Sequence, residues 1–339
     1  MRRVVVYPGR IAVEAAEIPA PGPGEALVRT LVAGVCGSDL HAARGRHPFV
    51  PLPYRPGHEV VGVVEAIGSG VGTCAPGQRV IVEPDLPCWA CKMCSSGREN
   101  LCENLQFFGC GYPQGGMADY FTLAAGRLRP VPDALDDQAA ALIEPLSTPV
   151  HAVRLAGEVA GRAIAVLGAG TIGLFTLAVL RARGAGKVVS TDPNRAKRER
   201  AAALGAHSTI DAGTPDVAGQ VRKALGGSAD IVFDCVAIQS SIDQAIAMAD
   251  KGGTVVVVGV PAREVTIPLP IVQDHQIRIQ GSATYLPEDY QESAALLRRG
   301  AVRTADFVTA TRPLAQVAEA FELASSGNHV KVLVTVGER

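Results

Sequence analysis

Four cysteines in one short segment constrain the fold of this chain more than any other feature. They are spaced C-x2-C-x2-C-x7-C and are Cys88, Cys91, Cys94 and Cys102. Four thiolates at this spacing can surround one zinc ion as a tetrahedron, with metal–sulfur distances of about 2.3 Å. A closed set of four sulfurs leaves no position for a substrate, so segment 88–102 is predicted to hold a structural zinc ion. The alternative is a pair of disulfides, which would require an oxidising compartment.

Composition and charge narrow the class of protein. The chain has 339 residues, of which 47% are hydrophobic, with 32 basic and 33 acidic side chains. This length favours two globular domains. The balanced charge gives no electrostatic footprint for nucleic acid or for an anionic membrane, so neither is expected as a partner. The first residues lack the apolar core of a signal peptide, and we expect a cytoplasmic protein whose thiols stay reduced.

The hydrophobic pattern changes near Val150. Before it, short β-branched runs broken by Pro and Gly predict a largely antiparallel β domain, with strands at Ala26–Val32, Val60–Ile67 and Arg79–Val82. After it, apolar runs alternate with Ala-rich helical segments, which is typical of a parallel α/β sheet. These runs are Ala163–Leu167, Lys187–Thr191, Ile231–Asp234 and Thr254–Val258. The uncharged stretch from Ala163 to Leu180 is long enough to suggest a membrane span, but its glycines indicate a strand, a turn and a helix.

The sequence A-I-A-V-L-G-A-G-T-I-G-L predicts a dinucleotide site. Gly168, Gly170 and Gly173 lie where a buried strand ends and a helix begins, with Thr171 and Ile172 in the same turn. The glycines permit a tight turn, close approach of the backbone to a pyrophosphate, and close packing of helix on strand. The helix N-terminus adds the positive end of a dipole.

An acidic residue follows this turn at the expected distance. Asp192 ends the next predicted strand, where a carboxylate can accept hydrogen bonds from a ribose diol. It would repel a 2′-phosphate, which favours NAD over NADP. Basic residues follow it at Arg195, Lys197, Arg198 and Arg200. They are interpreted mostly as a solvated helix face, and Lys197 is included among the predicted cofactor contacts.

Two N-terminal segments complete a family pattern. They are G-V-C-G-S-D-L-H (Gly34–His41) and P-G-H-E-V-V-G (Pro56–Gly62). Together with the four cysteines and the glycine turn, in this order, they closely resemble the zinc-dependent medium-chain alcohol dehydrogenases over essentially the whole chain. The segment I-E-P-L-S-T-P-V-H-A-V (Ile143–Val153) resembles the polyol branch, which includes sorbitol, xylitol and threonine dehydrogenases. Ethanol-type members have a cysteine ligand in this region, where the present chain has Glu144.

The resemblance implies an α/β fold of two domains. A GroES-like, β-rich catalytic domain would comprise residues 1–147 and 286–339, and a Rossmann domain of doubly wound parallel sheet would comprise 148–285. The active site would lie in the cleft between them. Relatives assemble as dimers or tetramers, so a homodimer or homotetramer is expected.

The resemblance also implies a second, catalytic zinc ion. Cys36, His58 and Glu144 would be its protein ligands and would leave a fourth position open. Glu59 would either contact the zinc-bound water or replace it as a ligand. Asp39 would accept a hydrogen bond from His58 and orient it.

Further roles follow from the same resemblance. Ser38 would accept the alcohol proton, and His41 would pass it to solvent. Val258, Val260 and Ser282 would supply backbone groups near the nicotinamide. Lys331 would contact the cofactor pyrophosphate. The remaining cysteines at 74, 110 and 235 match no ligand spacing and are interpreted as packing residues.

The predicted activity is transfer of a hydride between a secondary alcohol and NAD, with a polyol, sugar alcohol or cyclitol as substrate. Alternatives stay open: oxidation of L-threonine, of an aminocyclitol of the deoxy-scyllo-inosamine type, or of a sugar acid or sugar phosphate. The loop Arg44–Tyr54 carries Arg44, Arg46 and His47, which would attract an acidic substrate or are merely solvated. Outside this class, the alternatives are a zinc-finger binding protein and a relative that has lost its metal.

Overall fold

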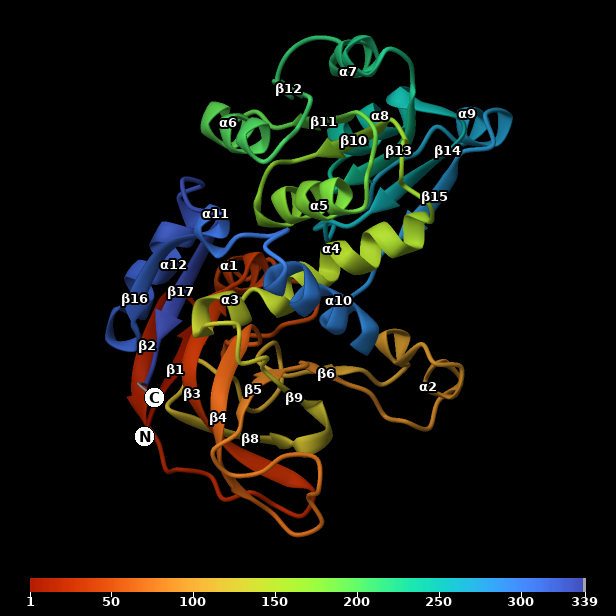
Figure 1. The fold of residues 1–339 in the computed structure, drawn as a ribbon. Helices are drawn as coiled ribbons and strands as arrows, with labels where there is room; N and C mark the ends of the chain where they lie inside the picture. The colour runs from red at the N-terminus through yellow and green to blue at the C-terminus, as the bar shows by residue number, and fades with distance from the viewer. Residues whose placement is uncertain (338–339) are drawn as a thin grey trace. The chain divides into compact units, whose positions relative to one another are not determined.

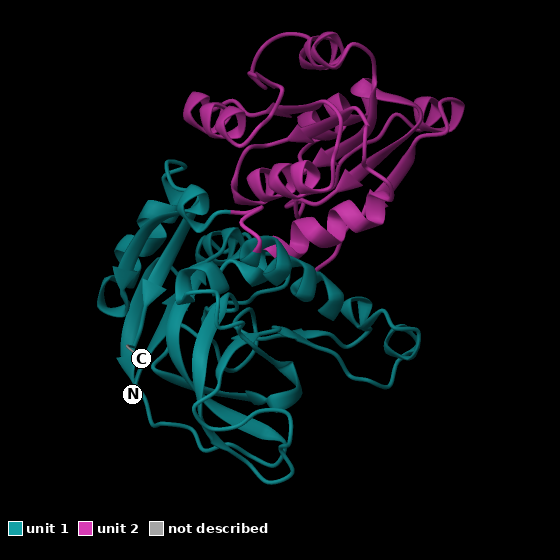
Figure 2. Cartoon of the chain, viewed as in Figure 1, with its two compact units in different colours: residues 1–145, 286–298, 303–339 teal, residues 146–285, 299–302 magenta. Residues whose placement is uncertain are grey.

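The computed structural model describes residues 1–337, which form two compact units (Figure 1). Unit 1 comprises Met1–Pro145, Leu286–Arg298 and the described residues from Arg303 onward, and unit 2 comprises Leu146–Tyr285 and Arg299–Val302 (Figure 2). The sequence predicted domain boundaries at 147/148 and 285/286. In the structure the units change at Pro145/Leu146 and Tyr285/Leu286, and Arg299–Val302 also belongs to unit 2. The last two residues of the predicted range 286–339 lie outside the described residues.

The main sheet of unit 1 has seven strands. Their order is β16-β17-β3-β4-β5-β9, and β8 pairs with β3. Every pairing in this sheet is antiparallel except that of β16 with β17. The strands are β3 (Glu25–Val35), β4 (Val60–Ile67), β5 (Arg79–Val82), β8 (Tyr120–Ala124), β9 (Leu128–Pro130), β16 (Val308–Pro313) and β17 (Lys331–Thr335). The strand runs predicted before Val150 coincide with β3, β4 and β5.

Shorter elements complete unit 1. A separate hairpin pairs β1 (Arg2–Tyr7) with β2 (Arg10–Ala15). The helices are α1 (Gly37–Ala43), α2 (Lys92–Ser95), α3 (Asp137–Ala140), α10 (Pro287–Arg298), α11 (Thr304–Phe307) and α12 (Val317–Ser325), with single 3₁₀ turns at Glu99–Leu101, Ala125–Arg127 and Leu314–Gln316. The core includes Phe108 and Phe121, whose rings lie 4.9 Å apart and are fully buried. Burial of a side chain of this size contributes about 1.5–3 kcal/mol.

A two-stranded ladder connects the cysteine segment to this core. It pairs β6 (Asp85–Leu86) with β7 (Gln106–Phe107), with Asp85 opposite Phe107. The ladder brings together the two ends of segment 88–102, which therefore projects as a small lobe containing α2.

Unit 2 is built on a six-stranded parallel sheet with the order β12-β11-β10-β13-β14-β15. Its strands are β10 (Ile164–Leu167), β11 (Val188–Thr191), β12 (Ser208–Ile210), β13 (Ala229–Asp234), β14 (Ala249–Val257) and β15 (Arg278–Gly281). The strand order reverses its direction at β10, which is the doubly wound arrangement expected from the sequence. Ligands of such sheets bind at the carboxyl ends of the strands beside this reversal.

Helices cover both faces of this sheet because both faces of β10 are apolar. Ala165 and Leu167 belong to the core cluster formed with α7 and α8, whereas Ile164 and Val166 alternate with them and are equally buried. In Figure 1, α5 lies on the side of the sheet opposite α7. The helices are α5 (Thr171–Ala182), α6 (Arg195–Ala203), α7 (Val217–Leu225), α8 (Gln239–Met248) and α9 (Leu269–Asp274), and α4 (Ile143–Ala156) begins in unit 1 and continues in unit 2.

The uncharged stretch Ala163–Leu180 forms β10, the glycine turn and part of α5, as predicted. Within residues 1–337, no helix has both the length and the apolar character that crossing a membrane requires.

Candidate metal centres and dinucleotide site

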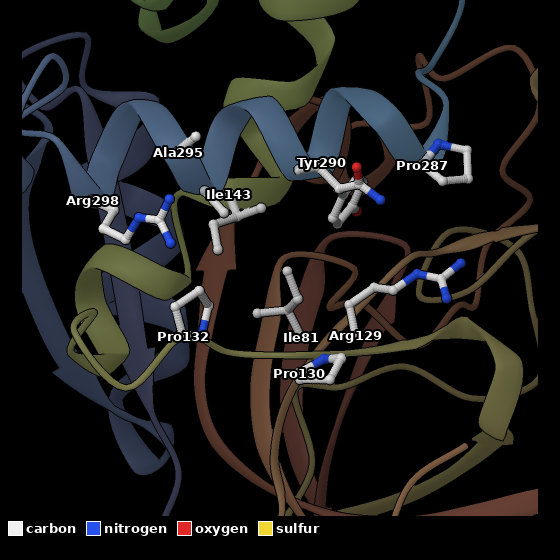
Figure 3. Close-up of a pocket in the computed structure, with 11 residues that line it drawn as sticks. Ile81, Arg129, Pro130, Pro132, Ile143, Pro287, Tyr290, Ala295 and Arg298 are labelled. Carbon is white, nitrogen blue, oxygen red and sulfur yellow. The ribbon is translucent and has the colours of Figure 1, made fainter. Parts of the chain in front are cut away.

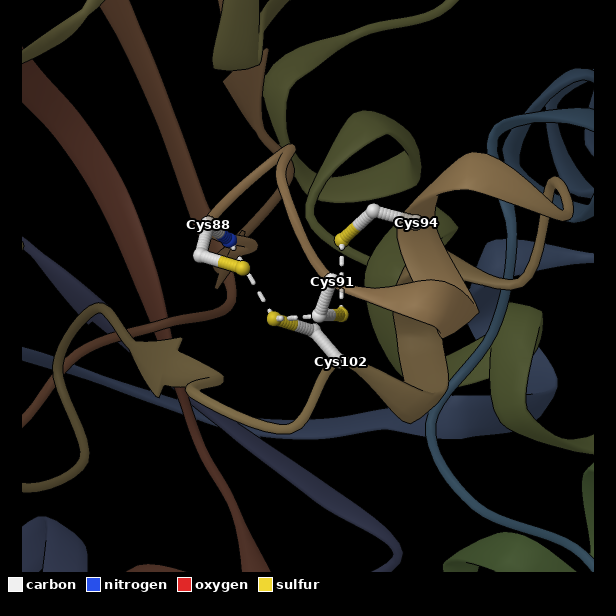
Figure 4. Close-up of side chains that lie close together, drawn as sticks. All are labelled: Cys88, Cys91, Cys94 and Cys102. Atoms are coloured by element: carbon white, nitrogen blue, oxygen red, sulfur yellow. Dashed lines mark hydrogen bonds between the residues drawn. The ribbon is translucent and has the colours of Figure 1, made fainter.

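The four cysteines of the lobe converge in space. Their sulfur atoms all lie within 4.8 Å of one another. Cys91 Sγ is 3.5 Å from Cys94 Sγ and 3.9 Å from Cys102 Sγ (Figure 4). A disulfide would require an S–S distance of about 2.05 Å, so the alternative of two disulfides is wrong. The arrangement fits the predicted structural zinc, because zinc holds four sulfurs at one tetrahedral centre.

Backbone amides of the lobe favour the thiolate form. Cys88 N–H and Asn104 N–H donate to Cys102 Sγ at 3.2 and 3.3 Å. Backbone N–H groups of Cys94 and Glu103 lower the pKa of Cys91 to about 6. Because the thiolate is the form that binds metal, the hydrogen bonds to Cys91 favour zinc binding at that residue, whereas burial and the neighbouring sulfurs raise the pKa of Cys94 to about 12.

A second cluster lies beside the main sheet of unit 1. Ligand atoms of Cys36, His58 and Glu59 all lie within 4.8 Å of one another. Cys36 is the N-cap of α1, directly after β3, while His58 and Glu59 directly precede β4. Since β3 and β4 are antiparallel neighbours, the end of one strand and the start of the other bring the three side chains together.

The donor set of this cluster suits a catalytic metal. It offers one sulfur, one nitrogen and one oxygen, which resembles the three-ligand zinc sites that keep a fourth position open. His58 is 3% exposed, and its Nδ1 atom is buried without a hydrogen-bond partner. The Phe107 ring meets the imidazole edge-on, with centroids 5.5 Å apart. A buried imidazole nitrogen left unpaired is unusual, and it supports a metal-binding role.

The counter-ion of Glu59 is Lys331, which the sequence analysis placed at the cofactor pyrophosphate. Lys331 Nζ donates to Glu59 Oε1 at 2.6 Å, to Glu59 Oε2 at 2.7 Å and to Val35 O at 3.2 Å. Both side chains are almost fully buried, and a Cβ at Gly34 would collide with the Glu59 carboxylate. Burial lowers the pKa of Lys331, but the negative charges of Glu59 and Cys36 raise it overall.

The predicted contact between Lys331 and the cofactor pyrophosphate is therefore corrected. An ammonium has three donors, and all three are directed to Glu59 and Val35. The lysine belongs to the cluster of Cys36, His58 and Glu59, where its charge balances that of Glu59.

Glu144 is near this cluster but outside it. It lies in the first turn of α4, is 7% exposed, and is not one of the three residues whose ligand atoms converge. Its charge nevertheless contributes to raising the pKa values of His58 and Lys331. Cys36, His58 and Glu59 are therefore the predicted ligands whose atoms form a converging group in this structure.

Asp39 orients a different ligand from the one predicted. Its Oδ2 accepts the backbone N–H of Cys36 at 3.0 Å, and its Oδ1 accepts the Tyr54 hydroxyl at 3.1 Å. It makes no hydrogen bond to His58 Nδ1, so that prediction is wrong. The physical reason is the α1 N-terminus, where the third residue of the helix caps the N-cap amide. Asp39 acts on His58 only through charge, which contributes to the raised pKa of the imidazole.

Ser38 and His41 lie one turn apart on α1. The Ser38 hydroxyl is buried without a hydrogen-bond partner, whereas His41 is exposed. Residues three apart on a helix share a face, so the spacing suits a relay from a buried site to solvent.

The glycine turn of unit 2 has the geometry predicted for a pyrophosphate site. Gly168 follows β10 with φ of +89°, and α5 begins at Thr171, directly followed by Ile172. A Cβ at Gly173 would collide with the Gly168 carbonyl, so only glycine allows α5 to pack this closely. A Cβ at Gly170 would meet nothing within 4 Å, which leaves open space above the backbone where a phosphate would approach.

Asp192 closes this turn from the neighbouring strand end. It is 6% exposed, and its carboxylate accepts Ala169 N–H at 2.9 Å and Asn194 N–H at 2.8 Å. Each oxygen keeps a lone pair for a ribose hydroxyl. Arg198 donates to the Asp192 carbonyl at 2.8 Å and pairs with Asp211, so it is anchored within the unit, while Lys197 is half-buried on α6.

The remaining predicted cofactor residues follow β14 and β15. Val258 is buried, and Val260 is 63% exposed. Ser282 N–H donates to Val257 O at 2.9 Å, and the Ser282 hydroxyl is buried without a partner. These residues lie at the carboxyl ends of the strands, where cofactors of this sheet type bind.

Sequence reasoning missed three residues that shape the metal cluster. They are Gly34, Tyr54 and Phe107. Gly34 lies in the family segment Gly34–His41, and its lack of a side chain beside a metal motif was a usable signal. Nothing local in the sequence marks Tyr54 or Phe107, because each reaches the cluster from a separate segment.

Comparisons with known proteins agree with this geometry. Residues 22–133 match the family model described as the alcohol dehydrogenase GroES-like domain, and residues 171–299 match the zinc-binding dehydrogenase model. The chain is 36% identical over 307 residues to L-galactonate-5-dehydrogenase of Escherichia coli (strain K12), covering 90% of this chain and 89% of that protein. It is 34% identical over 337 residues to sorbitol dehydrogenase of Macaca fascicularis, covering 98% of this chain and 94% of that protein.

A solved structure extends the likeness to three dimensions. A zinc-binding dehydrogenase of Sinorhizobium meliloti 1021, bound to NADP, superimposes with a TM-score of 0.92 at 32% sequence identity, covering 98% of each chain. The matched regions contain the cysteine lobe, Cys36, His58 and part of the glycine turn. The chain belongs to the zinc-dependent medium-chain polyol dehydrogenase family.

Proposed function

We propose that this protein oxidises a secondary hydroxyl of a polyhydroxy compound with NAD, and that Cys36 and His58 bind the catalytic zinc. The convergence of Cys36, His58 and Glu59 within 4.8 Å supports this most directly. Either Glu59 or Glu144 completes the ligand set with an oxygen. The structural zinc is held by the four cysteines of the lobe. Metal analysis of the purified protein tests this assignment: two zinc ions per chain are expected, and one or none would contradict it.

Each residue of the cluster has a defined task in this proposal. Zinc held by this cluster would supply a Lewis acid that lowers the pKa of a substrate hydroxyl towards neutrality, and NAD held by unit 2 would accept the hydride. Ser38 accepts the hydroxyl proton as it passes its own proton on, through the ribose of the cofactor, to His41, which releases a proton to solvent. Lys331 holds the Glu59 carboxylate in place through two hydrogen bonds. Phe107 limits the movement of the His58 ring.

Asp192 is proposed to select NAD. Its buried carboxylate lies at the carboxyl end of β11, directly beside the glycine turn, where it would meet a ribose diol or repel a 2′-phosphate. Replacement by Ser should weaken NAD binding and reduce the preference for NAD over NADP. Fluorescence titration with both reduced cofactors measures this, and an unchanged preference would show that another group reads the ribose.

Two substrate classes compete within this activity. Sorbitol dehydrogenase and L-galactonate-5-dehydrogenase are both relatives, and one name denotes a polyol while the other denotes a sugar acid. We favour a neutral polyol or cyclitol, with sugar acids, aminocyclitols and L-threonine as alternatives. The argument for a sugar acid is the positive charge of Arg44 and Arg46, which are exposed near His47. The pKa of His47 is lowered by burial and by the charges of His41 and His58.

A panel of substrates with NAD decides between these classes. Polyols, cyclitols, aldonates, aminocyclitols and L-threonine would be compared by kcat/KM from NADH formation. The double variant Arg44→Gln, Arg46→Gln tests the charge of the loop, with Arg162→Gln in unit 2 as the matched control. A loss of kcat/KM confined to aldonates in the double variant would favour sugar acids. A kcat/KM that is highest on polyols and unchanged in the double variant would favour neutral polyols.

We also propose a homo-oligomer in the cytoplasm. The strand β15 is an outer strand of the sheet in unit 2, and apolar side chains nearby are exposed, including Val260, Leu269 and Ile279. An unpaired edge with apolar neighbours is suited to pairing with a second copy. The eight cysteines are thiols, as zinc sites require, which supports a reducing compartment. Light scattering on the wild type and on Ile279→Asp tests the assembly.

A further inference from the structure

Unit 1 contains a cavity that is separate from both metal clusters. Its volume is about 450 Å³, which falls in the range of small-molecule sites. The helix α10 forms one wall, and β9 with the loop after it forms the opposite wall (Figure 3). Apolar groups line most of it: Ile81, Pro130, Pro132, Ile143, Pro287 and Ala295. None of its lining residues belongs to the metal clusters or the glycine turn.

The two arginines of this cavity differ in their available donors. Arg129 donates through Nε and one terminal nitrogen to both Glu83 carboxylate oxygens, each at 2.7 Å. These donors are therefore occupied by a bidentate pair, and Arg127 contacts the same carboxylate at 3.3 Å. The guanidinium of Arg298, at the opposite end of the cavity in Figure 3, is exposed and makes no hydrogen bond or ion pair with any described residue. The cavity thus combines an apolar wall with one unpaired guanidinium.

The polar group of the remaining aromatic residue is also occupied. Tyr290 is 3% exposed, and its hydroxyl donates to Val82 O at 3.0 Å. It lines the cavity with its hydroxyl already bonded to the backbone. A ligand there would meet apolar surface along its length and a guanidinium at one end.

The cavity is lined by two segments of unit 1 that are distant in the sequence. Ile143 lies at the start of α4, and Pro287 begins α10. A ligand in the cavity would contact both helices at the same time.

We propose that this cavity binds a medium-chain monocarboxylate, with its carboxylate on Arg298 and its alkyl chain along the apolar wall. A guanidinium binds one carboxylate in a bidentate manner, and the single unpaired guanidinium of the cavity offers one such site, which matches a monoanion. The apolar wall excludes small hydrophilic anions, because they would leave that surface uncovered. The site is additional to the dehydrogenase activity.

Titration calorimetry with octanoate on the zinc-loaded protein tests the proposal. One saturable site per chain is expected, with octanol binding at least about tenfold more weakly because a charged hydrogen bond is lost. Arg298→Gln should weaken octanoate binding by about tenfold or more, and the neighbouring Arg299→Gln should leave it unchanged. Ala295→Trp should fill the cavity and abolish binding.

Two outcomes would overturn the proposal. One is the absence of saturable binding, or equal affinity in the wild type and Arg298→Gln. The other is loss of binding in Cys36→Ala, which would place the carboxylate at the metal cluster. If Ala295→Trp fails to fold by circular dichroism, the comparison of Arg298→Gln with Arg299→Gln decides alone.

Discussion

The two metal clusters of unit 1 are assembled in opposite ways. The cysteine lobe takes all four ligands from one segment, 88–102, and uses sulfur alone. The second cluster takes Cys36 from the end of β3 and His58 and Glu59 from the start of β4, and it depends on Lys331 from β17. A local set of identical ligands suits a closed structural site, whereas a mixed set built on a sheet suits a rigid site that reacts.

The clusters also differ in how they balance negative charge. In the lobe, backbone N–H groups of Cys94 and Glu103 lower the pKa of Cys91 to about 6, so the short loops themselves favour its thiolate. In the second cluster, a buried lysine neutralises a buried carboxylate. A buried charge without a partner is costly, so the second cluster requires a side chain from a distant strand. The difference predicts which variants should impair chemistry and which should impair folding.

The largest expected effect is on turnover. Cys36→Ala should lower kcat by about a thousandfold or more, because several kcal/mol of transition-state stabilisation depend on the metal. Cofactor binding and the unfolding temperature should change little. Steady-state kinetics and NADH fluorescence titration measure these quantities, and a comparable loss of NADH binding would contradict the separation of the two sites.

Replacing a ligand of the lobe should act on stability instead. Cys91→Ala should remove one zinc ion per chain and lower the free energy of unfolding by several kcal/mol, about the scale of losing a structural metal or disulfide. Denaturant unfolding and metal analysis measure both effects. The packing cysteine Cys74 provides a matched control through Cys74→Ala. A stable Cys91 variant that retains two zinc ions would show that the lobe is not a metal site.

Lys331 tests the charge balance of the second cluster, because its partner Glu59 is both a buried acid and a candidate metal ligand. Lys331→Met should destabilise the zinc-free protein by about 3–5 kcal/mol, since it leaves the Glu59 carboxylate buried without a counter-ion. Zinc should restore part of this loss. Lys331→Arg, which keeps the charge, is the control. Equal losses with and without zinc would show that Glu59 does not face the metal.

A smaller effect is expected at Asp39. Asp39→Asn should weaken zinc binding at the second cluster by about tenfold, because the carboxylate no longer anchors the Cys36 amide. Competition with a chromogenic chelator measures the affinity. Tyr54→Phe should cost less, since it removes only one hydrogen bond to Asp39. Unchanged zinc affinity in Asp39→Asn would show that Cys36 is positioned by the backbone alone.

The smallest effect is expected at Cys110, which interacts electrostatically with His58 but is not a ligand. Burial raises the pKa of its thiol to about 12, so it stays protonated at neutral pH. Cys110→Ala should therefore retain two zinc ions and turn over within about twofold of the wild type. Iodoacetamide should modify Cys110 slowly at pH 8. Loss of the catalytic zinc in Cys110→Ala would instead show that the Cys110 sulfur is a ligand of the second cluster.

Much of the fold was predictable because its signals are local. The runs Val60–Ile67 and Arg79–Val82 form the strands β4 and β5 with the same bounds. The glycines of the turn are required by contacts within a few residues, such as that between Gly173 and Gly168. The two errors have different causes. Asp39 accepts from the nearby Cys36 amide at its own helix N-terminus and from Tyr54, whereas Lys331 pairs with the distant Glu59.

The sequence by itself determined the cysteine lobe, the glycine turn, the strand positions and the family, because each depends on neighbouring residues or on the order of short motifs. Only the tertiary structure decided what surrounds the second metal cluster. Lys331 and Glu59 are 272 positions apart, and they meet because β17 pairs with β3 beside β4. No local pattern can specify a buried ion pair whose two charges become neighbours only when the sheet has formed.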